Sequence, residues 1–267
     1  MNPTLRFLAR CAACIPALLI VAGCQTNPVT GRQQLMIVSE AEAQSASAKA
    51  YAKTVGAAQT QRKLDTNAAR TNRVKAITQR LVAQAVAVVP GSARWAWQVH
   101  VIDDASVNAW CMPGGKMAVY TGLITKLDIT DDELAQVMGH EISHALLHHG
   151  RERMSRAVAM NVGLQVGSIA TGVNLSGLES VAMIALELPN SRTAETEADV
   201  LGMEIAARAG YDPNAAVSLW QKMATVSGNA KPPEWLSTHP SDQTRIANLR
   251  ALVPKMTPLY EAARKRR

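Results

Sequence analysis

The segment Thr130–Gly150, TDDELAQVMGHEISHALLHHG, contains the strongest structural signal in the chain. Thr130 and Glu133 form a capping box, and two aspartates between them add negative charge at the positive end of the predicted helix. Apolar residues then recur at helical spacing up to the paired histidines before Gly150. We therefore expect one amphipathic helix that runs to His149 and stops at Gly150, since glycine commonly follows a helix end.

Within this helix, the residues His140-Glu141-Ile142-Ser143-His144 have the pattern His-Glu-x-x-His. Residues four positions apart lie one turn apart on the same helical face. Two imidazoles at that spacing can bind one Zn²⁺ at about 2.0–2.1 Å, and the glutamate between them then lies beside the water position of the metal. The pattern predicts His140 and His144 as metal ligands and Glu141 as the catalytic general base.

A tetrahedral catalytic zinc needs a third protein ligand and an open position for water. A third histidine six residues after His144 is excluded, because that position is Gly150. His148 lies too far along the helix to reach a metal held by His140 and His144. We expect His148 and His149 at the helix C-terminus, where a positive imidazolium suits the helix dipole. The remaining ligand is then a carboxylate from a second helix.

The segment Ala194–Asp199 offers two glutamates for this role. Glu195 shares a helical face with Asp199 and with small residues that would let another helix approach closely. Glu197 shares a different face with charged residues and is expected to face solvent. We therefore predict Glu195 as the third metal ligand. Asp199 would accept an N–H from one of the zinc histidines and fix its tautomer.

The rest of the chain predicts an α+β domain that is mostly helical, with one small antiparallel sheet. Pro113-Gly114-Gly115 predicts a hairpin between the last two strands. The uncharged stretch 157–175 is long enough for a membrane span, but its polar residues and glycines favour packed helices or a mobile cover over 157–190. The predicted helices cover 39–55, 67–89, 130–149, 157–186 and 191–209 and begin at 212 and 241, and the strands cover 95–102, 106–112 and 116–120.

The first residues have the pattern of an export signal. A positive start precedes an apolar run, Cys11–Ala22, which is too short to span a bilayer. The sequence Val21-Ala22-Gly23-Cys24 resembles a bacterial lipoprotein signal, in which Cys24 is acylated and becomes the first mature residue. An ordinary secretory signal and an uncleaved anchor are the alternatives. We expect residues 1–23 to be removed, residues 24–38 to form a lipid-anchored tether, and residues 39–267 to form a single domain.

The formal net charge of +7 does not indicate a nucleic-acid partner, because acids and bases are interspersed and the dense basic run is confined to Arg264–Arg267. One phenylalanine and four tyrosines also argue against an aromatic platform for bases. After removal of residues 1–23, Cys111 is the only cysteine besides Cys24, so no internal disulfide is expected. Cys111 is predicted as a packed strand residue rather than a nucleophile.

Several motifs together resemble those of the HtpX-like and CAAX-prenyl-protease-like family of zinc metallopeptidases. They are Asn27–Arg32, Asn108-Ala109, Pro113–Lys116, Val119–Gly122, His140–His144, Glu195–Asp199 and Ser237–Pro240. The likeness covers about 27–250 and is greatest to the soluble bacterial branch of lipoprotein or periplasmic peptidases. It implies a zincin-type fold packed by the active-site helices, one Zn²⁺ per chain and polypeptide substrates. Gln25 after the cysteine favours an outer-membrane lipoprotein facing the periplasm, with a soluble periplasmic protein as the alternative.

The same resemblance implies an edge strand that receives substrate as an added strand. This edge maps to the hairpin with Asn108, Gly114 and Gly115, for which a plain buried hairpin is the alternative. The resemblance also implies that His239 is either a fourth, inhibitory ligand or a donor to the transition state, and a capping or hydrogen-bonded loop histidine is the alternative. Arg245, in the helix that follows, is a candidate oxyanion partner.

The sequence as a whole predicts a zinc metalloendopeptidase of the bacterial cell envelope. Its expected substrates are misfolded or misassembled outer-membrane or periplasmic proteins, and outer-membrane assembly machinery is a candidate partner. The alternative is an envelope assembly factor or chaperone in which the protease is idle or blocked by His239. A zinc-site variant that still supports outer-membrane integrity would favour this alternative.

Overall fold

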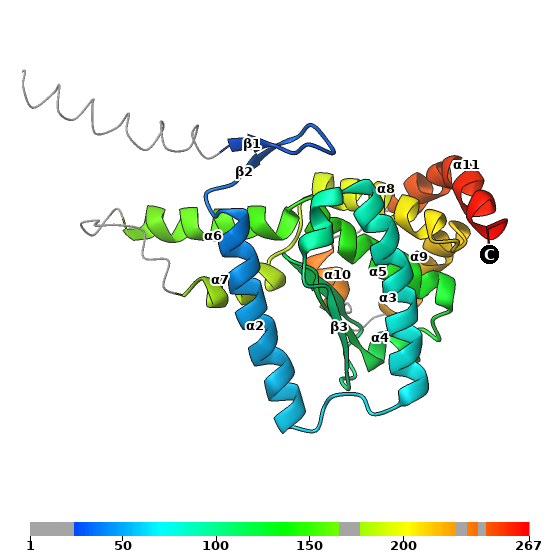
Figure 1. Cartoon of the computed structure of the whole chain (residues 1–267), viewed down its shortest axis with the longest axis horizontal. Helices are drawn as coiled ribbons and strands as arrows, with labels where there is room; N and C mark the ends of the chain where they lie inside the picture. Colours follow the sequence, from blue (N-terminus) through cyan, green and yellow to red (C-terminus); the bar gives the residue numbers. More distant parts are fainter. Residues whose placement is uncertain (1–23, 166–176, 228–233, 240–243, 267) are drawn as a thin grey trace, which may run out of the picture.

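The computed structural model describes residues 24–165, 177–227, 234–239 and 244–266. The predicted signal peptide and residues 166–176 of the predicted cover lie outside these residues. Figure 1 shows a mostly helical molecule, as predicted. The described helices are α2 (Glu40–Thr60), α3 (Ala68–Val88), η1 (Pro90–Arg94), α4 (Thr121–Lys126), α5 (Asp131–Leu146), α6 (His149–Gln165), α7 (Leu178–Glu187), α8 (Arg192–Arg208), α9 (Asn214–Ser227), α10 (Glu234–Thr238) and α11 (Arg245–Arg264).

Side-chain caps explain where three of the predicted helices begin. Ser39 accepts the backbone N–H of Glu42 at the start of α2, and Asn67 and Ser191 cap α3 and α8 in the same way. The capping box of Thr130 and Glu133 is also formed, at the start of α5. The sequence therefore places these N-termini to within one residue.

The central sheet is mixed rather than antiparallel. Strands β4 (Ala109–Met112) and β5 (Lys116–Tyr120) form the predicted antiparallel hairpin. However, β3 (Gln98–Ile102) pairs with β5 in parallel, and the strand order is β3-β5-β4. After β3 the chain crosses to the far edge of the sheet and forms β4. It then turns back through the hairpin as β5, which lies between β4 and β3 and runs in the same direction as β3. The prediction of an antiparallel sheet is therefore wrong for this pair, and β4 is an edge strand.

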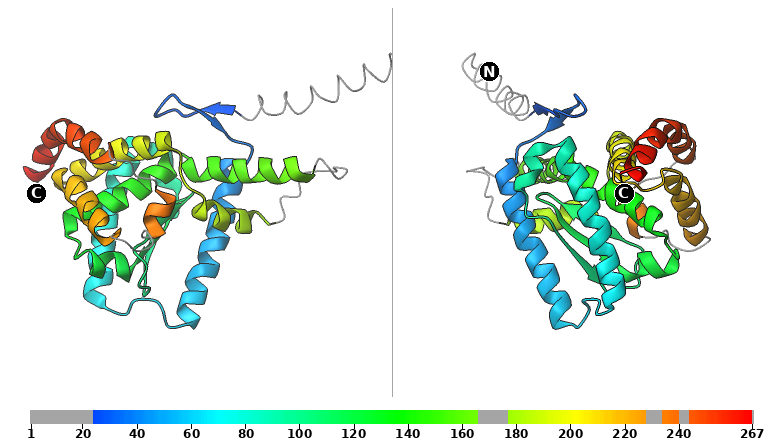
Figure 2. Two further views of the ribbon diagram at one scale, coloured as in Figure 1. Left: turned by 180° about the vertical axis from the view of Figure 1, so that it is seen from behind. Right: turned by 45° about the vertical axis from the view of Figure 1, so that its right-hand side comes forward.

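Two hydrophobic clusters lie on opposite faces of this sheet, because successive strand residues point to opposite sides. Met117 and Val119 pack on one face with residues of α3 and α5. Trp110 and Ala118 pack on the other face with residues of α2, α6 and α7. Figures 1 and 2 show the sheet between the long helices α2 and α3. The sheet is thus covered by helices on both faces, and α5 lies directly against it.

The crossing of α5 and α8 is a contact of glycine with glycine. A Cβ atom on Gly139 would lie 2.8 Å from the Gly202 carbonyl oxygen, and one on Gly202 would lie 2.8 Å from Cα of His140. No side chain fits between the two backbones. This confirms the expectation that small residues let a second helix approach the helix that carries His140.

Substitution of this glycine tests how tightly the crossing is set. We expect Gly202→Ala to lower the free energy of unfolding by about 2–3 kcal/mol, because the new methyl group meets backbone that cannot turn away. It should also weaken zinc binding, because a displacement of α8 would shift Glu195, which lies on the same helix. Gly56→Ala is the matched control, because nothing lies within 4 Å of a Cβ there. Urea unfolding curves and zinc titrations for the two variants should differ; equal behaviour would contradict the prediction.

Helix α5 ends earlier than the sequence predicts. Its last residue is Leu146, and His148 adopts a left-handed conformation with φ of 58°. A new helix, α6, begins at His149 and includes Gly150. A Cβ on Gly150 would lie 3.1 Å from the Pro113 ring, so this glycine allows packing against the hairpin turn and does not end the helix. The predicted end at Gly150 is therefore wrong.

The segment expected as a tether is folded at its start. Strands β1 (Cys24–Thr26) and β2 (Gln33–Leu35) form an antiparallel hairpin, with Cys24 exposed. Asn27 and Gln34 each donate a side-chain N–H to the carbonyl of Leu147 at 2.9 Å. The last carbonyls of a helix lack partners within it, so the hairpin satisfies a group that the end of α5 leaves open.

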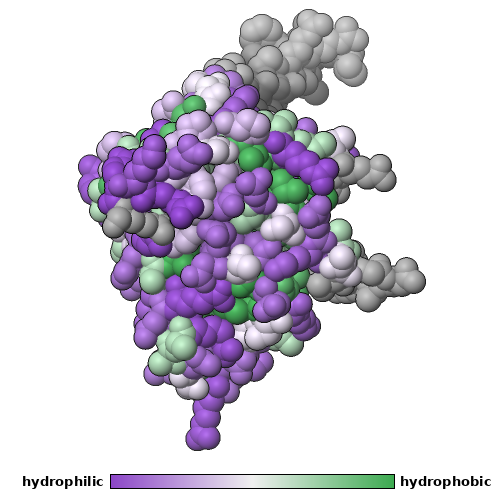
Figure 3. Space-filling view, turned by 90° about the vertical axis from the view of Figure 1, so that its right-hand side faces the viewer, coloured by the Kyte–Doolittle hydropathy of each residue, from purple (hydrophilic) through white to green (hydrophobic). Residues whose placement is uncertain are grey.

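Hydrophobic side chains lie mainly inside the described part of the molecule. Figure 3 shows a face that is largely hydrophilic, with hydrophobic residues in small separated areas. Within the described ranges, no helix combines the length and the apolar character that crossing a membrane requires.

Candidate metal centre

Helices α5 and α8 and the end of α10 bring four predicted side chains to one buried point. Nε2 of His140 lies 3.0 Å from Nε2 of His144 and 3.2 Å from Nδ1 of His239. A carboxylate oxygen of Glu195 lies 3.3 Å from Nε2 of His144 and 3.0 Å from Nδ1 of His239. One donor atom from each of the four residues lies within 4.8 Å of the others.

These separations fit a tetrahedral zinc site. Ligand atoms at about 2.0–2.1 Å from Zn²⁺ occupy corners that are about 3.3 Å apart. The closest distances in the cluster run from 3.0 Å to the 3.5 Å between Nε2 of His140 and Oε2 of Glu195. Three imidazole nitrogens and one carboxylate oxygen are also the donors that zinc accepts, whereas calcium and magnesium favour oxygen alone. The residues present therefore fit a zinc ion.

Asp199 on α8 and Arg245 on α11 contact members of the cluster from outside it. Oδ1 of Asp199 lies 3.0 Å from Nδ1 of His140, as the sequence predicts. Arg245 donates to Oε2 of Glu195 and to Oδ1 of Asp199, each at 2.7 Å, and its guanidinium stacks 3.9 Å above the Trp220 ring. Arg245 thus orients two carboxylates. Its predicted part as an oxyanion partner stays a prediction.

Glu197 and His149 do not lie where the sequence predicts. His149 is buried, and its Nδ1 lies 2.8 Å from Nδ1 of His144. Its Nε2 lies 2.9 Å from Oε2 of Glu197, which also accepts from Arg32 at 3.1 Å. Burial lowers the pKa of His149, which favours the neutral ring. The predictions of a solvent-facing Glu197 and a charged His149 at a helix end are therefore wrong, because the N-terminal hairpin covers this side of α8.

The charges in the cluster are strongly coupled. Burial disfavours the charged form of His140, but Asp199 and Glu195 raise its pKa to about 9. Burial holds the pKa of His144 well below its ordinary value. Burial opposes ionisation of Glu195, yet His239 and the other histidines hold its pKa well below the usual range. A metal must displace the proton on His140 before that ring can act as a ligand.

Glu141 lies beside this cluster on the floor of a cleft. Nε1 of Trp235 donates to Oε1 of Glu141 at 2.7 Å, and Nε2 of His239 lies 3.3 Å from the same oxygen. Trp235 is almost fully buried and stacks on the His239 ring. Sequence reasoning missed Trp235, although its position four residues before His239 would have placed both side chains on one helical face.

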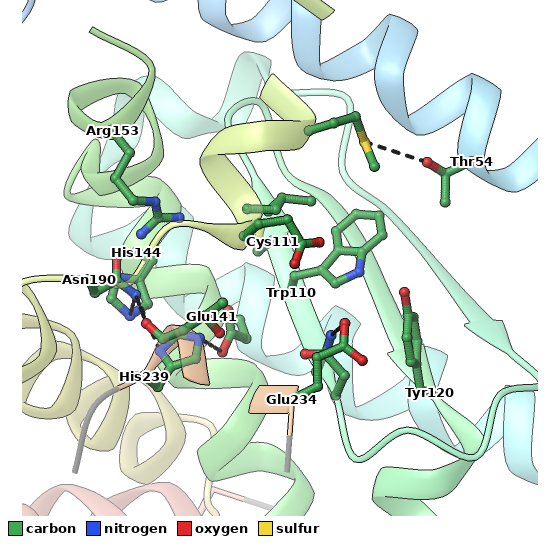
Figure 4. A pocket seen from close by; sticks show the side chains of 16 residues that line it. Thr54, Trp110, Cys111, Tyr120, Glu141, His144, Arg153, Asn190, Glu234 and His239 are labelled. Atoms are coloured by element: carbon green, nitrogen blue, oxygen red, sulfur yellow. Dashed lines mark hydrogen bonds and ion pairs between the residues drawn. The ribbon is translucent and has the colours of Figure 1, made fainter. Parts of the chain in front are cut away.

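The cleft runs between the edge strand β4, helix α7 and the segment that carries His239. Figure 4 shows His144, Glu141 and His239 together at one side and Trp110 and Tyr120 at the other. Asn108 lines the cleft and donates to Glu234 at 3.0 Å. Cys111 also lines it, and burial raises the pKa of its thiol well above the ordinary value, which disfavours the nucleophilic thiolate.

Gly114 and Gly115 are not among the residues that line the cleft. Both lie in the turn between β4 and β5, with φ of 81° and 76°. A Cβ on Gly115 would lie 2.4 Å from the Trp97 ring. The turn requires glycine at these positions for backbone geometry and packing, so the structure gives no support to a substrate contact there.

Comparison with known proteins now gives the family. Residues 68–253 match the model of peptidase family M48, and the chain belongs to this family. Mitochondrial metalloendopeptidase OMA1 of Bos taurus is 32% identical over 89% of this chain and 47% of its own length. OMA1 of Schizosaccharomyces pombe is 36% identical over 65% of this chain and 52% of its own length. The beta-barrel assembly-enhancing protease of Yersinia pestis is 29% identical over 70% of this chain and 40% of its own length.

The resemblance seen in the sequence is thus confirmed at the level of the M48 family. The relatives named here are OMA1 peptidases and a beta-barrel assembly-enhancing protease rather than HtpX or CAAX proteases. The chain spans about half the length of the curated relatives it matches.

Proposed function

We propose that this chain is a zinc metalloendopeptidase that hydrolyses peptide bonds in misfolded or misassembled proteins of the bacterial cell envelope. The observation that carries the proposal is the cluster of His140, His144, Glu195 and His239 with Glu141 beside it. Membership of a peptidase family whose named relatives are metalloendopeptidases supports the reaction class.

His140, His144 and Glu195 would hold the ion. Bound zinc would supply Lewis acidity to the scissile carbonyl and to water. Glu141 takes the proton from the attacking water and passes it to the leaving amine. The hydrogen bond from Trp235 fixes the orientation of the Glu141 carboxylate. Asp199 holds the ring of His140, and the stacked Arg245 holds Asp199 and Glu195 in place.

With zinc held by the other three residues, His239 would take the position that a catalytic water needs. Its Nδ1 completes the set of donors, and its Nε2 lies 3.3 Å from the general base. Hydrolysis therefore requires His239 to withdraw. This contact favours the second candidate function, an envelope assembly factor or chaperone in which the protease is held inactive. An outer-membrane integrity assay of a zinc-site variant separates the two functions, because only the assembly factor works without zinc.

The proposed location is the outer membrane, with a lipid anchor at Cys24 and the domain facing the periplasm. Exposure of Cys24 at the start of β1 supports access for lipid attachment. The name of the Yersinia pestis relative refers to beta-barrel assembly, which supports outer-membrane assembly machinery as a partner. A soluble periplasmic protein is the alternative; mass spectrometry of the purified N-terminal peptide distinguishes an acylated Cys24 from a free one.

Metal removal tests the proposed reaction. We expect the full chain to cleave unfolded casein and to lose that activity after treatment with 1,10-phenanthroline, because the water is no longer activated. Addition of stoichiometric Zn²⁺ should restore cleavage, whereas Ca²⁺ should not. The measurement is release of fluorescent fragments from labelled casein. Full activity of a chain shown by metal analysis to hold no zinc would overturn the proposal.

A further inference from the structure

Arg153, on α6, has a charged group that the mechanism above does not use. Its Nε donates to the carbonyl of Ala185 on α7 at 2.7 Å. Its Nη1 is buried and makes no hydrogen bond within the described ranges. A buried N–H of a charged group without an acceptor is costly unless a ligand supplies one. Arg153 lines the cleft, and Figure 4 shows its guanidinium on the side of His144 and Asn190.

The charges along the cleft differ from one end to the other. Burial lowers the pKa of Arg153, and among the carboxylates the charges of Glu141 and Glu195 oppose that effect most strongly. If zinc is bound, Glu195 becomes a ligand, so less negative charge faces the guanidinium. Glu234 and Glu187 also line the cleft, and their charges add to the effect of burial in raising the pKa of Tyr120. One side of the cleft therefore carries a guanidinium together with carboxylates, whereas the side near Tyr120 carries carboxylates alone.

A peptide added along β4, on the edge that pairs with no other strand among the described residues, would pass both sides of the cleft, because β4 lines it beside Glu141. We propose that Arg153 binds a carboxylate of the substrate next to the scissile bond, and so gives the peptidase a preference for an acidic group at one position. This inference rests on the proposed peptidase function. A guanidinium pairs with a carboxylate through two parallel hydrogen bonds. In Arg153, Nη1 and Nη2 can donate them, because Nε already donates to Ala185.

The carboxylate can come from two sources, an aspartate or glutamate side chain or the C-terminus of the substrate chain. Peptide pairs distinguish them. One set of fluorogenic peptides differs only by Glu or Gln at each position flanking the cleaved bond. A second set carries a free or an amidated C-terminus close to that bond. We expect the wild-type chain to favour the charged member of one pair by about tenfold in kcat/KM, mainly through KM.

Arg153→Gln should abolish this discrimination, so that the charged and neutral peptides are cleaved at similar rates. Arg156→Gln is the matched control: it removes the same charge from the same helix, but Arg156 is half exposed and pairs with Glu152 at 2.5 Å. It should keep the wild-type ratio. Arg153→Lys should retain part of the preference, because lysine keeps the charge but not the planar fork. Zinc content and thermal unfolding of each variant check its fold.

Three results would overturn the inference: a wild-type chain without preference for the charged member of any pair, an Arg153→Gln chain that keeps the preference, or an Arg156→Gln chain that loses it equally. The comparison of Glu and Gln peptides on the wild-type chain tests the inference even if the Arg153 variants do not fold. Absence of cleavage of every peptide by the zinc-loaded chain would instead contradict the proposed function. Cleavage without discrimination contradicts only the role of Arg153.

Discussion

Glu141→Gln should lower kcat for peptide cleavage by about 10³-fold while the chain still binds one zinc ion. The amide has nearly the same shape as the carboxylate but cannot take a proton from water. Oε1 of Glu141 accepts from Nε1 of Trp235, and an amide oxygen can accept the same bond, so the local structure should be kept. The measurements are kcat with a fluorogenic peptide and zinc content by mass spectrometry.

Glu133→Gln is the control for this variant. Glu133 lies on the same helix and is buried, but it pairs with Lys222 at 2.7 Å, away from the cluster. We expect it to lower the melting temperature and to leave kcat near the wild-type value. If Glu141→Gln retained wild-type cleavage with zinc bound, Glu141 would not be the general base.

The second large effect is expected from a comparison of Glu195, a proposed permanent zinc ligand, with His239, a proposed displaceable one. Glu195→Gln should weaken zinc binding by at least about 100-fold, because it removes the only carboxylate among the four donors and one of the two carboxylates that pair with Arg245. His239→Ala should keep zinc bound and raise kcat, because it frees the corner that water needs. Competition with a chromophoric zinc chelator gives the affinities, and peptide cleavage gives kcat.

Glu204→Gln is the control on α8, since Glu204 forms an exposed pair with Arg208 at 2.7 Å. It should change neither zinc affinity nor kcat. Loss of zinc from His239→Ala to the same extent as from Glu195→Gln would show that His239 is a permanent ligand. A fall in kcat with zinc retained would instead assign His239 to the transition state, the other use that the family resemblance allows.

Local patterns predicted the parts of the site that depend on one helix. The spacing of His140 and His144 follows from helical geometry, and a capping box fixed the start of α5. The choice of Glu195 over Glu197 followed from the small residues on its face, and the contact of Gly139 with Gly202 shows why they matter. These signals need no knowledge of distant contacts.

The remainder depended on contacts between segments far apart in the sequence. Nothing local shows that β5 enters the sheet between β3 and β4, so the parallel pairing was missed. Nothing near Glu197 shows that Arg32 covers it across 165 positions. Trp235 donates to Glu141 across 94 positions, and Arg153 donates to the Ala185 carbonyl on another helix. Contacts between distant segments leave no periodic trace in the sequence, which is why its pattern did not reveal them; the four-residue spacing of Trp235 and His239 is a local signal that was overlooked.

The hairpin of β1 and β2 lies outside the stretch that the M48 family model matches, residues 68–253. Arg32 reaches Glu197, which holds His149, which in turn touches His144. A protein trimmed to the recognised stretch would lack that guanidinium and leave the α5 end without its cover. A recombinant chain that starts downstream of this hairpin is therefore expected to hold the ring of His144, a proposed zinc ligand, less firmly.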